Sequence, residues 1–189
     1  IALVHPEGFR FTPNQNIIIT NVMASQKKNI EKILKNYNVL STQDASPLRN
    51  NSMACVAFPT CSLAMAESER YLPSLLTKIE IILQKYELSK QAIKIRLAGC
   101  PNGCSRPYVA EVAFVGRTLG KYDMFLAGSL KGNRLNQVYK TNVNEDAILE
   151  IMENLIKNFA KDKQPQESFG DFCIRKDYAK EIKDGKELY

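Results

Sequence analysis

The stretch QAIKIRLAGCPNGCSRP, residues Gln91–Pro107, carries the clearest structural signal in the chain. Its first half alternates isoleucine and leucine with polar side chains, which is typical of a strand with one buried face. The strand pattern then gives way to a loop that holds Cys100 and Cys104 with three residues between them. Pro101 restricts its own φ and Gly103 tolerates a positive φ, so this loop can turn tightly. The stretch therefore predicts a strand that delivers two thiols at its end.

A second pair of thiols, Cys55 and Cys61, lies earlier in the chain with five residues between them. Four thiolates that converge from two constrained loops can bind a soft metal. Spacing alone leaves three interpretations open: a structural zinc ion, a four-thiolate iron–sulfur cluster, or thiols that pack as small apolar side chains. Zinc sites usually use shorter Cys-x2-Cys spacings, and His5 is the only histidine, so the pattern favours the cluster.

Composition narrows the class of protein. With 44% hydrophobic and 24% charged residues, the chain is an ordinary soluble globular protein, and no apolar run is long enough to cross a membrane. Five cysteines and no secretory leader predict a reducing, cytoplasmic location. The net charge of +6 comes from dispersed lysines without an aromatic stripe, so nucleic acid is not an expected partner. Because the first residue is Ile1, we expect the chain to be a fragment of a longer protein.

Two domains are predicted, because residues 41–52 form a polar stretch typical of a linker. In residues 1–40, a β-rich run at Gln15–Thr20 precedes a helix with Ser25 as its N-cap, which is half of a ferredoxin-like layer. Residues 41–189 are expected to form a mixed sheet flanked by helices, so the fold class is α+β. Apolar spacing predicts helices over 74–88 and 144–162, the second with Asn144 as its N-cap, and strands over 91–99, 109–116, 121–129 and 134–143.

The residues around both cysteine pairs resemble those of a known family. The segments NSMACVAFPTCSLAMAESERYLP (51–73) and GCPNGCSRPYVAEVAFVG (99–116) resemble the C-terminal half of the sulfite and nitrite reductase hemoproteins. The likeness is strongest to the beta subunits of the NADPH-dependent assimilatory branch. FRFTPNQNIIITNV (9–22) before these segments and the YKTN and FGDF motifs after them extend the resemblance over essentially the whole chain.

The resemblance implies an oxidoreductase of sulfur assimilation and cysteine biosynthesis. Cys55, Cys61, Cys100 and Cys104 would ligate a [4Fe–4S] cluster, and Cys104 would also bridge the cluster to the iron of siroheme. The implied reaction is the six-electron reduction of sulfite to sulfide, with nitrite reduction as the alternative. Electrons from NADPH would arrive through a separate flavoprotein subunit.

The resemblance also implies several contacts with siroheme. Asn102 lies inside the second cysteine motif, and a small side chain at position 54 would let the macrocycle approach. Arg10, Thr12, Asn14 and Gln15 form an RxTxNQ pattern before a predicted strand, and for this pattern an ordinary polar turn stays an open alternative. Ser105 departs from the family pattern, in which glycine is expected after the bridging cysteine. The residues implied to contact siroheme are Arg10, Thr12, Asn14, Gln15, Ala54, Asn102 and Cys104.

The chain matches only the second of the two pseudo-symmetric halves of the family enzyme. We therefore expect the N-terminal half of the polypeptide as a partner, no sulfite reductase activity from this chain alone, and no assignable catalytic residue within it. A homodimer through an unpaired strand edge of residues 1–40 is a further hypothesis. A non-enzymatic zinc or thiol module is the alternative from another class. Cys173 is expected to be a structural thiol.

Overall fold

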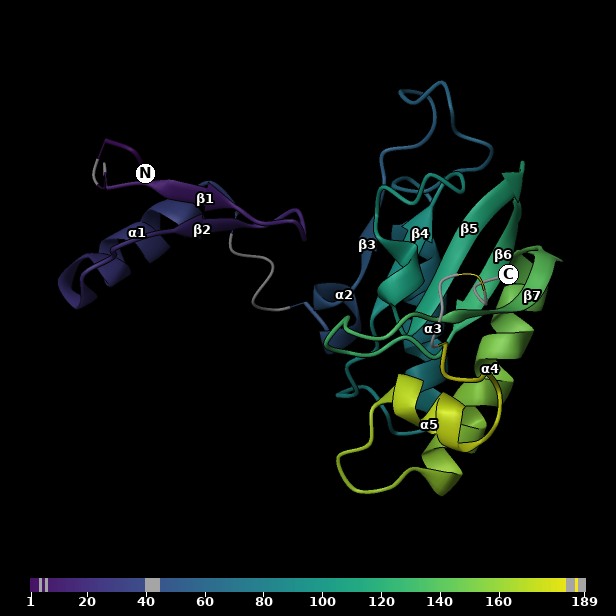
Figure 1. Cartoon of the computed structure of the whole chain (residues 1–189). Coiled ribbons are helices and arrows are strands. Elements are labelled where there is room, and N and C mark those ends of the chain that lie inside the picture. Colours follow the sequence, from purple (N-terminus) through teal and green to yellow (C-terminus); the bar gives the residue numbers. More distant parts are fainter. Residues whose placement is uncertain (4, 6, 40–44, 183–185, 187–189) are drawn as a thin grey trace. The chain divides into compact units, whose positions relative to one another are not determined.

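The chain forms two compact units, Ile1–Ala45 and Ser46–Tyr189, in a computed structural model that describes residues 1–3, 5, 7–39, 45–182 and 186 (Figure 1). The domain boundary expected between residues 40 and 41 falls on residues 40–44, which lie outside the described residues. The two units divide between Ala45 and Ser46, inside the stretch 41–52 that was predicted to be a linker. What each domain does remains a prediction.

The N-terminal unit is a two-stranded antiparallel hairpin followed by a helix. β1 (Phe9–Phe11) pairs with β2 (Ile17–Ile19), and α1 covers Ala24–Asn36. The sequence pattern indicated β2 and α1 but not β1, which has only three residues. The predicted N-cap at Ser25 is wrong. The cap is Met23, because the side-chain oxygen of Gln26 accepts a hydrogen bond from the Met23 amide at 3.1 Å.

This unit has very little core of its own. Among its described residues, the buried side chains are Ile30 and His5, and a ring nitrogen of His5 lies 2.5 Å from the Thr20 carbonyl oxygen. A unit of this size needs far more buried apolar surface to be stable by itself. Its exposed large apolar side chains are Leu3, Phe9, Phe11, Ile17, Ile18, Met23, Tyr37 and Val39.

The larger unit is built on a five-stranded mixed sheet with the order β3-β4-β5-β6-β7. Three strands run parallel: β3 (Met53–Ala54), β4 (Ile95–Ala98) and β5 (Val112–Thr118). β6 (Lys121–Leu126) and β7 (Gln137–Val143) continue the sheet in antiparallel fashion. Every strand predicted here exists, and the two-residue strand β3 was missed because it is too short to show alternation.

Helices cover one face of this sheet. α3 (Leu72–Lys85) and α4 (Glu145–Asp162) pack against each other, and α5 (Phe169–Arg175) adds to the same core (Figure 1). α2 (Pro47–Asn50) is a single turn inside the stretch predicted to be a loop, started by the Ser46 cap and Pro47. The largest fully buried apolar side chains of this core are Leu48, Leu75, Ile79, Leu83, Ile93, Ile95, Leu97, Phe114, Phe159, Phe169 and Phe172.

The other face of the sheet carries a smaller apolar cluster. Ala110, Ala113, Val115 and Phe125 are buried there, with the Tyr108 ring set edge-on against Phe125 at a centroid distance of 5.4 Å. Tyr108 belongs to a short 3-10 helix, residues 107–109. The loop that carries the second cysteine pair is therefore anchored on this face. None of the helices in the described part of the chain is long and apolar enough to cross a membrane.

The N-cap of α4 provides a test of the helix assignment. The Asn144 side-chain oxygen accepts a hydrogen bond from the Ala147 amide at 3.1 Å, as the sequence predicted. Asn144→Ala should lower the free energy of unfolding by about 1 kcal/mol, because one amide of the first turn loses its acceptor. Urea denaturation followed by circular dichroism measures this. The exposed mid-helix variant Glu150→Ala is the control, and an equal loss in both would contradict the assignment.

Candidate metal centre

The two cysteine loops leave the same edge of the larger sheet. β3 and β4 are neighbouring parallel strands, with Ala54 opposite Leu97. Cys55 follows β3 directly, and its amide donates a hydrogen bond to the Leu97 carbonyl at 3.1 Å. Cys100 follows two residues after β4 ends. Because both carboxyl ends lie at one edge, the loops that carry the two cysteine pairs meet there (Figure 1).

Gly99 joins the two loops through both of its backbone polar groups. Its amide donates a hydrogen bond to the Cys55 sulfur at 3.1 Å. Its carbonyl accepts from the amides of Met65 and Ala66 at 2.8 and 3.0 Å. A Cβ atom at position 99 would lie 2.7 Å from the Ala57 Cβ and 2.8 Å from the Ala66 carbonyl oxygen. The close approach of the loops therefore requires a residue without a side chain at this position.

The first loop is held in shape by its own backbone. The Cys61 amide donates to the Ala57 carbonyl at 2.8 Å, and the Ala64 amide donates to the Cys61 carbonyl at 3.2 Å. Ala57 has a positive φ of 47°, which reverses the chain just after Cys55. Both thiols of this loop are neither fully buried nor fully exposed. The sequence thus places a pair of accessible sulfurs on one ordered turn.

The second loop is clamped by Tyr108. Its hydroxyl donates a hydrogen bond to the Pro101 carbonyl at 2.9 Å. Gly103 adopts a φ of +68°, and a Cβ there would lie 3.0 Å from the Tyr108 ring. The Arg106 amide closes the turn on the Gly103 carbonyl at 2.7 Å. The predicted roles of proline and glycine in this turn are consistent with this geometry, and the turn leaves Cys104 exposed.

The Tyr108 clamp can be tested without any cofactor. Tyr108→Phe removes the hydrogen bond to Pro101 and keeps the ring, so the free energy of unfolding should fall by about 1 kcal/mol. Tyr37→Phe is the matched control, since that side chain is 76% exposed. Chemical denaturation of both variants measures the difference. Equal stability of Tyr108→Phe and the unmodified chain would show that the hydroxyl does not hold the loop.

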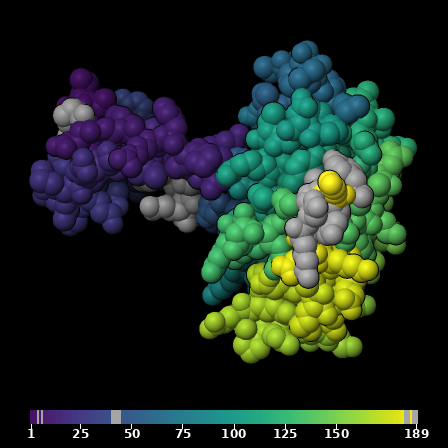
Figure 2. Space-filling view, viewed as in Figure 1, coloured from purple at the N-terminus to yellow at the C-terminus, as the bar shows by residue number. Residues whose placement is uncertain are grey.

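The surface around these loops is unusually apolar for a solvent-facing region. Val56, Leu63 and Met65 are 45%, 63% and 45% exposed, and Cys104 is exposed as well, whereas a free cysteine is generally buried. In Figure 2 the blue atoms of the first loop stand at one end of the larger unit. Thiols that only pack as small apolar side chains do not explain Cys104.

The thiols are not arranged around a single ion. No group of three His, Cys, Asp or Glu side chains within the described residues could hold a metal ion. A zinc site needs its sulfurs within about 2.3 Å of one ion. In an iron–sulfur cluster each thiolate ligates a different iron, so the two kinds of centre differ in the arrangement of sulfurs that they need.

The positive charge of Arg106, in the second loop, interacts with those of Arg96 on β4 and of Lys94 just before that strand. Arg96 is only 5% exposed on β4, and burial, followed by repulsion from Arg106, lowers its pKa to about 10. Burial also lowers the pKa of Lys94, with further lowering by Arg96 and Arg106, while Glu111 opposes the shift. Strand alternation alone places Arg96 on the face opposite the helices but does not show that this face is buried. The cluster of positive charge favours anions nearby.

The residues predicted from the RxTxNQ pattern all lie at the β1–β2 hairpin of the N-terminal unit. The Thr12 side-chain oxygen accepts hydrogen bonds from the amides of Asn14 and Asn16 at 3.3 and 3.1 Å. Gln15 has a positive φ of 62°, and its amide donates to the Thr12 carbonyl at 3.2 Å. Thr12 therefore shapes the turn, which agrees with the polar-turn alternative. Contact of these hairpin residues with siroheme stays a prediction.

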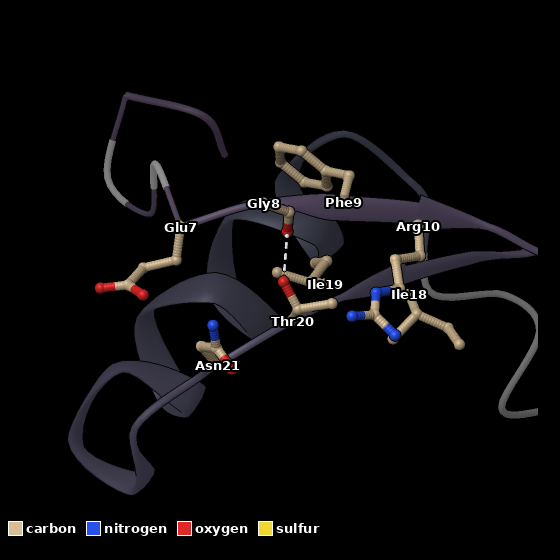
Figure 3. Close-up of a pocket in the computed structure, with 8 residues that line it drawn as sticks. All are labelled: Glu7, Gly8, Phe9, Arg10, Ile18, Ile19, Thr20 and Asn21. Atoms are coloured by element: carbon tan, nitrogen blue, oxygen red, sulfur yellow. Dashed lines mark hydrogen bonds between the residues drawn. The ribbon is translucent and has the colours of Figure 1, made fainter.

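Arg10 lines an open cavity of about 610 Å³ beside this hairpin (Figure 3). The Thr20 hydroxyl donates a hydrogen bond to the Gly8 carbonyl at 3.1 Å, and both residues line the cavity. Arg10 is exposed on β1 opposite Ile18. The other residues that line the cavity are Glu7, Gly8, Phe9, Ile18, Ile19, Thr20 and Asn21.

The remaining predicted residues of the larger unit lie at two different depths. Asn102 is exposed beside Cys104. Ala54 is 6% exposed and belongs to the core under the helices. Cys173 is fully buried in the same core, where burial raises the pKa of its thiol. A thiol that stays protonated is a poor metal ligand.

Comparison with known proteins supports one interpretation of these motifs, although no protein-family model matches the chain. The sulfite reductase [NADPH] hemoprotein beta-component of Oceanobacillus iheyensis is 54% identical over 189 residues, which is 100% of this chain and 33% of that protein. The proteins of the same name from Methylocella silvestris and Staphylococcus carnosus are 54% and 51% identical over 188 residues. The solved structure of the Mycobacterium tuberculosis NirA protein has a TM-score of 0.73 at 23% identity, covering 92% of this chain and 34% of that one.

At this level of identity across its whole length, the chain belongs to the sulfite and nitrite reductase hemoprotein family. Within that family, the proteins it resembles are beta-components of the NADPH-dependent sulfite reductase. The likeness to NirA confirms the α+β fold. The chain spans about a third of the length of the curated relatives it matches, with 33% and 32% for the first two.

Proposed function

We propose that this chain is the part of a sulfite reductase hemoprotein that holds a [4Fe–4S] cluster and the proximal side of siroheme. The observation that carries the proposal is the meeting of the two cysteine-bearing loops at the carboxyl ends of neighbouring parallel strands, joined by the hydrogen bond from the Gly99 amide to the Cys55 sulfur. When bound, the coupled cluster and siroheme would supply electrons and an iron site for the six-electron reduction of sulfite to sulfide.

The four cysteines of the two loops would hold the cluster, and one of them would also contact siroheme. Cys55, Cys61 and Cys100 would each ligate the cluster, and Cys104 would ligate it and also bridge to the siroheme iron. Cys104 is the exposed one of the four, which suits a ligand that must reach a second group outside the loop. The four thiols must be deprotonated to bind the cluster.

Siroheme itself would rest on the apolar surface beside the loops. Val56, Leu63 and Met65 provide exposed apolar area for a flat macrocycle, and Asn102 offers a polar contact beside Cys104. The Ala54 side chain is buried in the core, so its small size would leave room for siroheme above it. Further siroheme contacts are proposed for Arg10, Thr12, Asn14 and Gln15, with the arginine as partner for an acidic substituent.

The complete reaction needs more than this chain. The relatives are about three times as long, so the remaining length would supply the other side of the active site and a counterpart for the apolar hairpin of the N-terminal unit. We propose a flavoprotein reductase as the electron donor and sulfite as the substrate, with nitrite as the alternative. By itself the 189-residue chain would have no sulfite reductase activity.

The first experiment is to measure iron, acid-labile sulfide and visible absorption on protein purified without oxygen. About four irons and four sulfides per chain would support the cluster. Siroheme absorption bands beside them would support the second part of the proposal. Zinc in place of iron would favour a structural module, which is one of the interpretations that the cysteine spacing leaves open. Comparing the turnover of sulfite and nitrite by the full-length enzyme separates the two substrates.

A further inference from the structure

The Ser105 hydroxyl is a buried polar group with no partner. The side chain is 1% exposed, and its oxygen has no hydrogen-bond partner within the described part of the chain. Its neighbours in sequence, Cys104 and Arg106, are both exposed. Ser105 therefore points into the structure at the point where the loop presents the thiol proposed to bridge two cofactors.

A buried hydroxyl without a partner is costly, because it loses its hydrogen bonds to water and gains none. The other buried serines of this unit avoid that cost. The Ser68 hydroxyl donates to the Leu97 carbonyl at 2.8 Å, and the Ser129 hydroxyl donates to the Asn133 side-chain oxygen at 2.6 Å. Ser105 is the exception among the three, and it directly follows a proposed cluster ligand. Its partner is then expected in the group that those ligands hold.

We propose that the Ser105 hydroxyl donates a hydrogen bond to a sulfur of the bound cluster and thereby raises the cluster's reduction potential. This inference rests on the proposed function, because it needs a cluster. Hydrogen bonds to cluster sulfurs withdraw electron density and favour the reduced state. On the first cysteine pair, the Gly99 amide already donates to the Cys55 sulfur. Ser105 would be the corresponding donor on the second pair, and it is a side chain that substitution can remove.

The test compares Ser105→Ala with the unmodified protein, in the native polypeptide that carries this chain and with its cofactors bound. A redox titration followed by electron paramagnetic resonance should give a more negative midpoint potential for the variant at unchanged iron content. Electron–nuclear double resonance in heavy water should show the loss of one exchangeable proton near the cluster. Ser129→Ala is the matched control, because its buried hydroxyl has a protein partner, the Asn133 side-chain oxygen, outside both cysteine loops. It should leave both signals unchanged.

A second readout does not need the cluster. In the apoprotein, Ser105→Ala should unfold at the same or a higher temperature, because it removes a hydroxyl that has no partner there. Ser68→Ala should unfold at a lower temperature, because the Leu97 carbonyl loses one of its two donors and keeps only the Cys55 amide. A lower unfolding temperature for the Ser105→Ala apoprotein would overturn the proposal, since it would mean that the hydroxyl is already satisfied by the protein or by water.

The outcomes separate this inference from the function on which it rests. A wild-type protein without iron and sulfide would overturn both. A wild-type protein with a full cluster, whose potential and proton signal do not change in Ser105→Ala, would overturn only the role of Ser105. A more negative potential together with the loss of the proton signal would establish the hydroxyl as a donor to the cluster.

Discussion

Cys104→Ala should abolish cluster binding and lower the sulfite reductase activity of the native polypeptide by more than about 100-fold. Even changes to residues that merely orient a metal ligand cost about 10–100-fold, and Cys104 is proposed to hold two groups at once. Its thiol is exposed at the tip of a turn closed by Arg106 and Gly103, so the substitution opens no cavity in the core. Iron analysis, visible absorption and steady-state turnover on the same preparation measure the effect.

Cys173→Ala is the matched control for that experiment. The same atom is removed from a thiol that is fully buried in the helix-covered core, where burial raises its pKa. The expected result is a loss of about 1 kcal/mol in stability with iron content and activity retained. If Cys104→Ala kept a full complement of iron and its activity, Cys104 would not be a ligand. If Cys173→Ala lost its iron, the assignment of the four ligands would be wrong.

Much of the larger unit could be predicted from the sequence because its elements are long and periodic. The stripe of leucine and isoleucine over 74–88 became α3, and the Asn144 cap became the start of α4. What escaped prediction were elements of two to four residues, such as β1, β3 and α2. Elements of that length show no periodicity, and whether they form depends on strand pairing or on a proline at the helix start.

The site was predictable to a different degree. Residue types and spacing gave the two cysteine pairs, and the structure adds that both pairs leave one sheet edge. The bond from the Gly99 amide to the Cys55 sulfur joins residues 44 apart in the chain, so no local pattern reveals it. Burial of Arg96 and Ser105 likewise depends on which loop covers the sheet face. Contacts of this kind follow from tertiary packing and are invisible to periodicity.

Gly99→Ala should separate the two cysteine loops. Its backbone does not require glycine through a positive φ, so the effect comes from space alone. The new methyl group would lie 2.7 Å from the Ala57 Cβ and 2.8 Å from the Ala66 carbonyl oxygen, and neither is the end of a flexible side chain. Overpacking of this kind costs about 1–3 kcal/mol. Relief requires the first loop to move away, which weakens the hydrogen bond to the Cys55 sulfur.

Two measurements test whether the first loop moves in the Gly99→Ala protein. Urea denaturation of the apoprotein should show the loss in stability, and iron retention during incubation with a chelator should show faster release from the Gly99→Ala protein. Gly120→Ala is the control: it has a φ of +69° and open space around it, so strain costs about 1 kcal/mol without touching either loop. Both variants should lose stability, but only Gly99→Ala should displace Cys55. If iron is released faster from Gly99→Ala alone, the contact between the two loops is what keeps the cluster in place. Equal release from the two would assign the effect to general destabilisation instead.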